Sequence, residues 1–138
     1  MDLTAEQAQQ LAAVAKEHGL RLVLLFGSTV AGGTHARSDF DVAVRYASAP
    51  EDFRRLAHLQ HALQEVLPER QVDLAVINRA DPLLLKKITE RCQLLFGDPR
   101  DLEELKIYAF KRYQDHRRYF AMEQAFVDRF VNERAGAK

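Results

Sequence analysis

Three aspartates have the residue type and spacing for metal chemistry. Asp39 and Asp41 are separated by one apolar residue, in a segment whose polar and apolar residues alternate as in a strand. Residues i and i+2 of a strand point to the same face, so the Cα atoms of these two lie about 7 Å apart. Asp73 lies between Val72 and Leu74 in another apolar segment. If the two segments form adjacent strands, three carboxylates converge on one surface.

Carboxylates held this close repel one another, and each raises the pKa of its neighbours unless a cation neutralises them. Oxygen ligands on a rigid strand suit Mg²⁺, and such sites often hold two ions about 4 Å apart. The spacing of the aspartates therefore predicts a magnesium site with up to two ions.

Gly27 and Ser28 directly follow the apolar segment 20–26. A glycine lets the backbone approach a ligand closely, while backbone N–H groups and a serine hydroxyl can bind phosphate oxygens. Ten residues then separate Ser28 from Asp39. Each feature alone is commonplace, because aspartate and Gly-Ser are also ordinary turn residues. Together they predict a phosphate cradle facing a metal site, the layout for attack on the α-phosphate of a nucleoside triphosphate with pyrophosphate leaving.

The elements that must position these residues alternate between helices and strands. The pattern favours an α/β (α+β) fold, a sheet covered by helices. The expected order is a helix capped by Thr4 and ended by Gly19, strand 20–26, loop 27–38, strand 39–44, helix 51–66, strand 72–77, a helix from Pro82 to about residue 91, a short edge strand 93–96, and a long helix 101–131.

Composition narrows the function classes. The 138 residues suit one domain, and 47% hydrophobic content excludes a disordered chain. The 20 basic and 20 acidic residues cancel, so we expect no direct nucleic-acid binding. No apolar run approaches the roughly 18 residues of a membrane-spanning helix. The first residues do not resemble a signal peptide, so the expected location is the cytoplasm.

The segments 25–28, 38–44 and 72–77, with Gly32 between them, resemble the polymerase-beta-like nucleotidyltransferases. The likeness covers about residues 8–98 and is closest to the minimal nucleotidyltransferase (MNT) antitoxins encoded beside HEPN ribonuclease toxins. It implies a small mixed sheet flanked by helices, with a long C-terminal helix. It also implies ATP as substrate and transfer of AMP to a tyrosine hydroxyl of the partner toxin, which silences the ribonuclease.

The resemblance assigns roles residue by residue. Gly27 and Ser28 would hold the triphosphate. Asp39 and Asp41 would bind both metal ions, and Asp73 would complete the second metal site and help accept the proton of the attacking hydroxyl.

The loop after Ser28 departs from the family pattern. Arginines commonly follow Gly-Ser at the third and seventh positions, where this chain has Ala31 and His35. Arg37, two residues later, is the candidate replacement for triphosphate binding.

The sequence after residue 100 predicts a partner-binding element. Its apolar residues occupy much of the helix circumference, so one face would stay exposed on a monomer. They are Tyr108, Phe110, Tyr113, Tyr119, Phe120, Met122, Phe126, Val127 and Phe130. We therefore expect an MNT domain at residues 1–100 and a C-terminal helical extension at residues 101–138 that binds the toxin.

Two alternatives to a protein adenylyltransferase remain open. One is a non-catalytic antitoxin that acts by binding and occlusion. Retention of Ser28, Asp39, Asp41 and Asp73 argues against it, because occlusion needs none of them. The other is a nucleotidyltransferase for a small molecule such as an aminoglycoside. The short segment after residue 100 leaves little room to enclose such an acceptor.

Overall fold

A computed structural model describes residues 2–27, 39–48 and 52–136 of the chain. Helices and strands alternate along it as the hydrophobic pattern predicts. In chain order the elements are α1 (Ala5–Glu17), β1 (Leu20–Phe26), β2 (Phe40–Tyr46), α2 (Phe53–Val66), β3 (Val72–Val76), the 3₁₀ helix η2 (Ile77–Arg79), α3 (Pro82–Glu90), β4 (Cys92–Phe96) and α4 (Pro99–Gly136).

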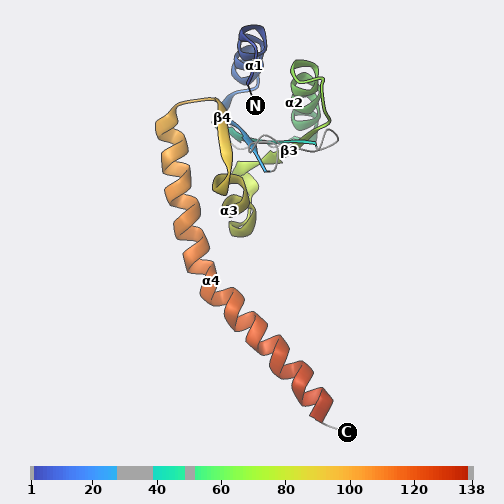
Figure 1. The fold of residues 1–138 in the computed structure, drawn as a ribbon, viewed down its shortest axis with the longest axis vertical. Helices are drawn as coiled ribbons and strands as arrows, with labels where there is room; N and C mark the ends of the chain where they lie inside the picture. The colour runs from blue at the N-terminus through green and yellow to red at the C-terminus, as the bar shows by residue number, and fades with distance from the viewer. Residues whose placement is uncertain (1, 28–38, 49–51, 137–138) are drawn as a thin grey trace.

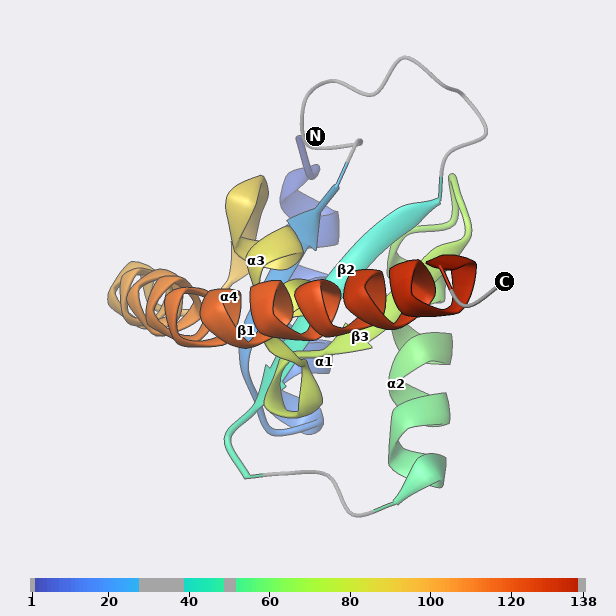
Figure 2. The ribbon, with the colours of Figure 1, turned by 90° about the horizontal axis from the view of Figure 1, so that it is seen from below.

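The strands form one mixed sheet in the order β3-β2-β1-β4. β1 pairs antiparallel with both β2 and β4, and β2 pairs parallel with β3. In Figure 1 the helices α1 and α2 lie above the sheet and α3 lies below it. Figure 2 shows β1, β2 and β3 behind α3 and α4. The predicted α/β fold is confirmed, including β4 as an edge strand.

The central strand β1 is buried on both faces, which explains its unbroken apolar sequence. Val23 and Leu25 belong to the core under α1 and α2, whereas Leu22 and Leu24 belong to the core under α3 and α4. All four side chains are fully buried. Two hydrophobic layers therefore fix the sheet, and β2 lies between β1 and β3 with its polar start at one end.

Local signals explain where the helices begin. The capping box predicted for α1 is present, because the Thr4 hydroxyl accepts from the Gln7 N–H and the Gln7 side chain accepts from the Thr4 N–H. Asp81 accepts from the Leu84 N–H and so caps α3, whose first residue is Pro82. Both patterns satisfy N–H groups that have no partner within a helix.

Some predicted boundaries are wrong. α2 begins at Phe53, whose side chain is 84% exposed and so does not belong to the core. β2 extends to Tyr46, and the strand after Gln71 ends at Val76, where η2 follows. α4 begins earlier and runs further than residues 101–131. These differences move ends of elements but do not change the order of the strands.

α4 packs on the domain only through its first turns. Leu102, Leu105 and Ala109 are buried against the sheet side that α3 covers. Arg21 donates two hydrogen bonds, of 2.9 and 3.0 Å, to the Asp101 carboxylate and so joins α4 to β1. Further along, α4 projects away from the sheet (Figure 1). No helix in the part of the chain described above is long and apolar enough to cross a membrane.

The projecting part of α4 has a continuous series of exposed apolar side chains, which we call the distal apolar face. Its members are each between 46% and 72% exposed. They are Tyr119, Met122, Phe126, Val127, Phe130 and Val131. The prediction that part of this helix stays uncovered on the isolated chain agrees with these exposures.

Candidate active site

Strand pairing brings together the residues that the sequence singles out for chemistry. In the parallel pair of β2 and β3, Asp41 lies opposite Asp73. In the antiparallel pair of β1 and β2, Phe26 lies opposite Asp41, so Gly27 adjoins the same end of the sheet. Asp39 lies two residues before Asp41, directly before the first residue of β2, and is exposed. The sheet therefore collects the three aspartates and Gly27 at one edge.

The electrostatics of Asp41 show how close these charges are. Burial raises the pKa of the Asp41 carboxyl, and the neighbouring charge of Asp73 raises it further. Lys87 opposes this increase, and Asp39 adds a smaller increase. An ionised carboxylate among other carboxylates is costly unless a cation neutralises it, so the site favours a bound cation.

The residues present fit magnesium by their chemistry. In the described residues, no three His, Cys, Asp or Glu side chains form a ready-made cage for a metal ion. Mg²⁺ does not require one, because it usually keeps several waters and takes one or two carboxylates together with substrate phosphates. Two facing aspartates with exposed Asp39 beside them offer that kind of partial, oxygen-only set.

Gly27 is required by the backbone and by the space beside Asp41. Its φ of +83° lies in the left-handed region that favours glycine. A Cβ atom at this position would lie 2.6 Å from Oδ2 of Asp41. The Gly27 N–H donates to the Arg91 carbonyl at 3.3 Å, so this N–H is already used within the protein. The main contribution of Gly27 to a ligand site is therefore its shape, because it has no side chain. The predicted triphosphate ligands Ser28 and Arg37, like Ala31 and His35, lie outside the described residues.

Two glutamines of α2 hold the outer edge of β3 beside Asp73. Gln64 Oε1 accepts from the Val72 N–H at 2.8 Å, and Gln60 Nε2 donates to the Val72 carbonyl at 2.9 Å. Gln64 Nε2 also donates to the carbonyls of Leu67 and Arg70, at 3.0 and 2.7 Å. These side chains take the place of a missing neighbour strand. Sequence reasoning missed them, because a glutamine on a helix face is usually solvated.

We expect Gln64→Ala to lower the free energy of unfolding by about 1–3 kcal/mol, because it leaves the part-buried Val72 N–H without a partner. The nucleotidyl transfer that the sequence predicts should fall as well, since β3 positions Asp73. Urea unfolding and transfer rates measure the two effects. Gln9→Ala, an exposed position on α1, is the matched control. Equal stability of the two variants would contradict the proposed role of Gln64 in holding the edge of β3.

Lys87 is a further candidate for the site. The sequence favours plain solvent exposure for Lys86 and Lys87, which follow one another in α3. Lys87 is exposed, but its charge acts on Asp41, whereas Lys86 lies over the Tyr113 ring of α4 at 5.0 Å. The effect of the Lys87 charge on Asp41 depends on how α3 packs against the sheet, which the sequence does not show.

Comparison with known proteins shows the family to which the chain belongs. The family described as "Polymerase beta, Nucleotidyltransferase" matches residues 9–101. The chain belongs to this nucleotidyltransferase family. The predicted fold and family are thereby confirmed, and the matched range contains Gly27 and all three aspartates.

Individual proteins are similar over most of the chain. Protein adenylyltransferase MntA of Shewanella oneidensis is 30% identical over 109 residues, which are 79% of this chain and 75% of that protein. A crystal structure of a toxin–antitoxin with AMP-PNP aligns with a TM-score of 0.71 at 26% identity, over 90% of this chain and 98% of that one. Spectinomycin adenyltransferase AAD(9), solved with ATP and spectinomycin, shares the fold at a TM-score of 0.51 and 18% identity, over 74% of this chain and 59% of that one.

Proposed function

We propose that this protein is an antitoxin that transfers AMP from ATP to a tyrosine hydroxyl of a cognate HEPN ribonuclease toxin and so neutralises it. The observation that carries the proposal is the alignment of Asp41 with Asp73 beside Gly27. Support comes from the similarity to a protein adenylyltransferase and to a toxin–antitoxin bound to an ATP analogue. The use of ATP makes the cytoplasm the expected location.

We infer that Asp39, Asp41 and Asp73 hold Mg²⁺, with up to two ions. The metal would neutralise the charge that develops on the phosphates. Gly27 and Ser28 would lie against the triphosphate, with Arg37 as an additional ligand. This assignment uses Asp39 and Asp41 for both metal ions and Asp73 for the second, and it leaves Lys87 free to offset the negative charge.

The proposed step is an exchange of one bond to phosphorus. The acceptor hydroxyl oxygen bonds to the α-phosphorus of ATP, and the bond from that phosphorus to the pyrophosphate oxygen breaks. The hydroxyl proton passes to the Asp73 carboxylate, which is exposed and so accessible to the acceptor. Its position opposite Asp41 gives Asp73 this role, since geometry decides a general base before its pKa does.

We propose that residues 1–100 form the catalytic domain and residues 101–138 the partner-binding element. The exposed distal apolar face supports this division. An apolar series of this length is costly to leave in water, so it indicates a protein contact. Burial of helical apolar side chains in a groove between partner helices is a common way to cover such a face.

The proposed reaction predicts a metal and pH dependence. Label from α-phosphate-labelled ATP should move to the co-purified toxin with Mg²⁺, and EDTA should stop this transfer. Because the pKa of Asp41 is raised above 3.8, protons compete with the metal at a higher pH than for an ordinary aspartate. Transfer should be complete above the raised pKa and fall as the pH drops through it, with the midpoint moving lower at higher Mg²⁺.

The same assay separates the alternatives. Tight toxin binding without transfer of label would favour the occluding antitoxin. Transfer to an added aminoglycoside and not to the toxin would favour the small-molecule enzyme. A pH midpoint that does not respond to the Mg²⁺ concentration would contradict metal binding at Asp41.

A further inference from the structure

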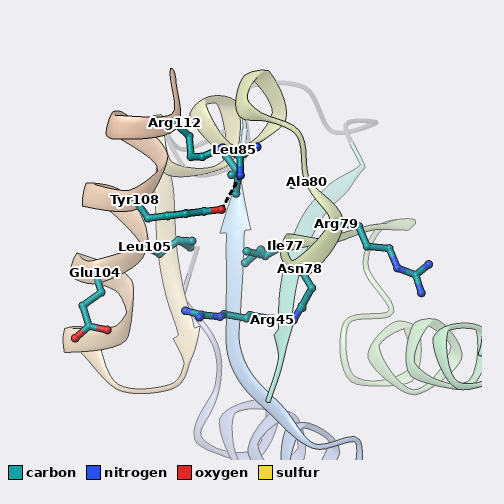
Figure 3. Close-up of a pocket in the computed structure, with 10 residues that line it drawn as sticks. All are labelled: Arg45, Ile77, Asn78, Arg79, Ala80, Leu85, Glu104, Leu105, Tyr108 and Arg112. Atoms are coloured by element: carbon teal, nitrogen blue, oxygen red, sulfur yellow. Dashed lines mark hydrogen bonds between the residues drawn. The ribbon is translucent and has the colours of Figure 1, made fainter. Parts of the chain in front are cut away.

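A pocket opens on the sheet face that α3 and α4 cover, with a volume of about 570 Å³. Figure 3 shows it between α4, the end of β2 and the segment η2. Arg45 lies at one end and Arg112 at the other, with the Tyr108 side chain between them (Figure 3). Ligand pockets for small molecules usually measure about 300–1,000 Å³, so this one has room for more than a single ion.

The pocket is separate from the carboxylate edge. Arg45 is four residues beyond Asp41 on β2, which places their Cα atoms about 13 Å apart along the strand. Between them, Ala43 is fully buried in the core that contains Leu85 and Ile88 of α3. The body of α3 therefore stands between the pocket and the aspartates.

Two of the three arginines that line the pocket, Arg45 and Arg112, have unused hydrogen-bonding capacity. Arg112 donates from Nη1 to the Tyr108 hydroxyl at 2.8 Å, but its Nε is buried without a partner. The half-buried side chain of Arg45 makes no hydrogen bond or salt bridge with any residue that the structure describes. A buried donor without an acceptor costs free energy, so a native structure that keeps one calls for an explanation.

No acidic side chain of the described residues satisfies these cations. Asp101 acts on Arg45 electrostatically, but both of its oxygens accept hydrogen bonds from Arg21. Glu104 also lines the pocket but makes no salt bridge or hydrogen bond with Arg45 or Arg112, and it is within electrostatic reach of Arg21. The pocket therefore keeps a surplus of positive charge.

We propose that this pocket binds a phosphorylated small molecule of mononucleotide size. Guanidinium groups bind phosphate through paired N–H donors, which Arg45 and Arg112 supply from opposite ends. The Tyr108 ring is 49% exposed and offers a flat apolar surface for a base. Its hydroxyl, which accepts from Arg112, still has a proton to donate to a phosphate oxygen. The site is independent of the AMP-transfer reaction.

AMP, inorganic phosphate and adenosine are the probes, titrated by calorimetry in EDTA so that metal-dependent binding at the aspartates is absent. We expect AMP to bind, phosphate to bind more weakly and adenosine not to bind. Asp41→Asn should bind AMP as the unmodified protein does. Arg45→Gln and Arg112→Gln should each weaken AMP binding by at least about tenfold, whereas Arg100→Gln, an exposed arginine of α4, should not.

Two further measurements keep the result clear of folding effects. Thermal melting without AMP verifies that each variant is folded. The ¹⁵N resonance of Arg112 Nε, assigned through Arg112→Lys, should shift on AMP addition, because the unpartnered N–H gains an acceptor. The proposal is overturned if AMP fails to bind at about 1 mM, or if folded Arg45→Gln and Arg112→Gln bind it with unchanged affinity. It is also overturned if Asp41→Asn abolishes the binding.

Discussion

Replacement of Asp41 by asparagine is expected to slow AMP transfer to the toxin by about a thousandfold, because one lost metal ligand removes several kcal/mol of charge stabilisation. Asparagine has nearly the same shape, so contacts with Gly27 and the register with Asp73 should persist. Transfer of labelled AMP, measured with the co-purified toxin, tests the rate. Toxin binding by the variant should stay unchanged.

The stability of Asp41→Asn shows whether the loss of AMP transfer comes from the chemistry of the site or from unfolding of the protein. A raised folded-state pKa means that ionised Asp41 destabilises the metal-free protein at neutral pH. Asp41→Asn should therefore melt at the same or a higher temperature than the unmodified protein without metal. The difference should shrink as the pH falls through the raised pKa, because Asp41 is then protonated too.

Asp52→Asn is the matched control, since asparagine also serves as the N-cap of α2. It should retain full transfer. A transfer rate for Asp41→Asn within tenfold of that of the unmodified protein would show that Asp41 is not a metal ligand.

The second large effect is expected from the distal apolar face. Met122 and Phe126 are one helical turn apart and are 72% and 70% exposed. Met122→Glu with Phe126→Glu should weaken toxin binding by at least about a hundredfold, because two apolar contacts worth about 1.5–3 kcal/mol each are lost and two charges must be buried. Affinity measured by calorimetry tests this, and transfer should fall with it.

Ile107→Glu is the matched control. Ile107 is a 56% exposed apolar residue in the part of α4 that packs on the domain, outside the distal apolar face. The melting temperature of the double variant should equal that of the unmodified protein, because both side chains are already exposed. Unchanged affinity in the double variant would show that the toxin binds elsewhere.

Much of the fold can be predicted from the sequence because local and long-range signals agree. The Thr4 capping box, Pro82 at the start of α3 and the apolar run of β1 each mark an element that the structure contains. The strand–helix–strand segment from Phe40 to Val76 predicts parallel neighbours, because a helix must return the chain to the same sheet edge. The sequence analysis leaves the adjacency of these two strands as a condition, and the structure meets that condition with Asp41 opposite Asp73.

The remainder depends on packing that no sequence pattern specifies. Gln64 looks like any polar residue of a helix until the order of the described strands shows β3 at the end of the sheet. The pocket between Arg45 and Arg112 requires α4, η2 and the end of β2 to come together, and the two arginines are far apart in the sequence.

The length of α4 sets the geometry of the assembly. Its 38 residues span about 57 Å, nearly twice the diameter of a small domain. A toxin bound at the far end of α4 would be held well away from the aspartates. The tyrosine that receives AMP must then belong to an elongated partner that reaches back along α4, or to another toxin subunit. Shortening α4 by whole turns would test which of the two applies.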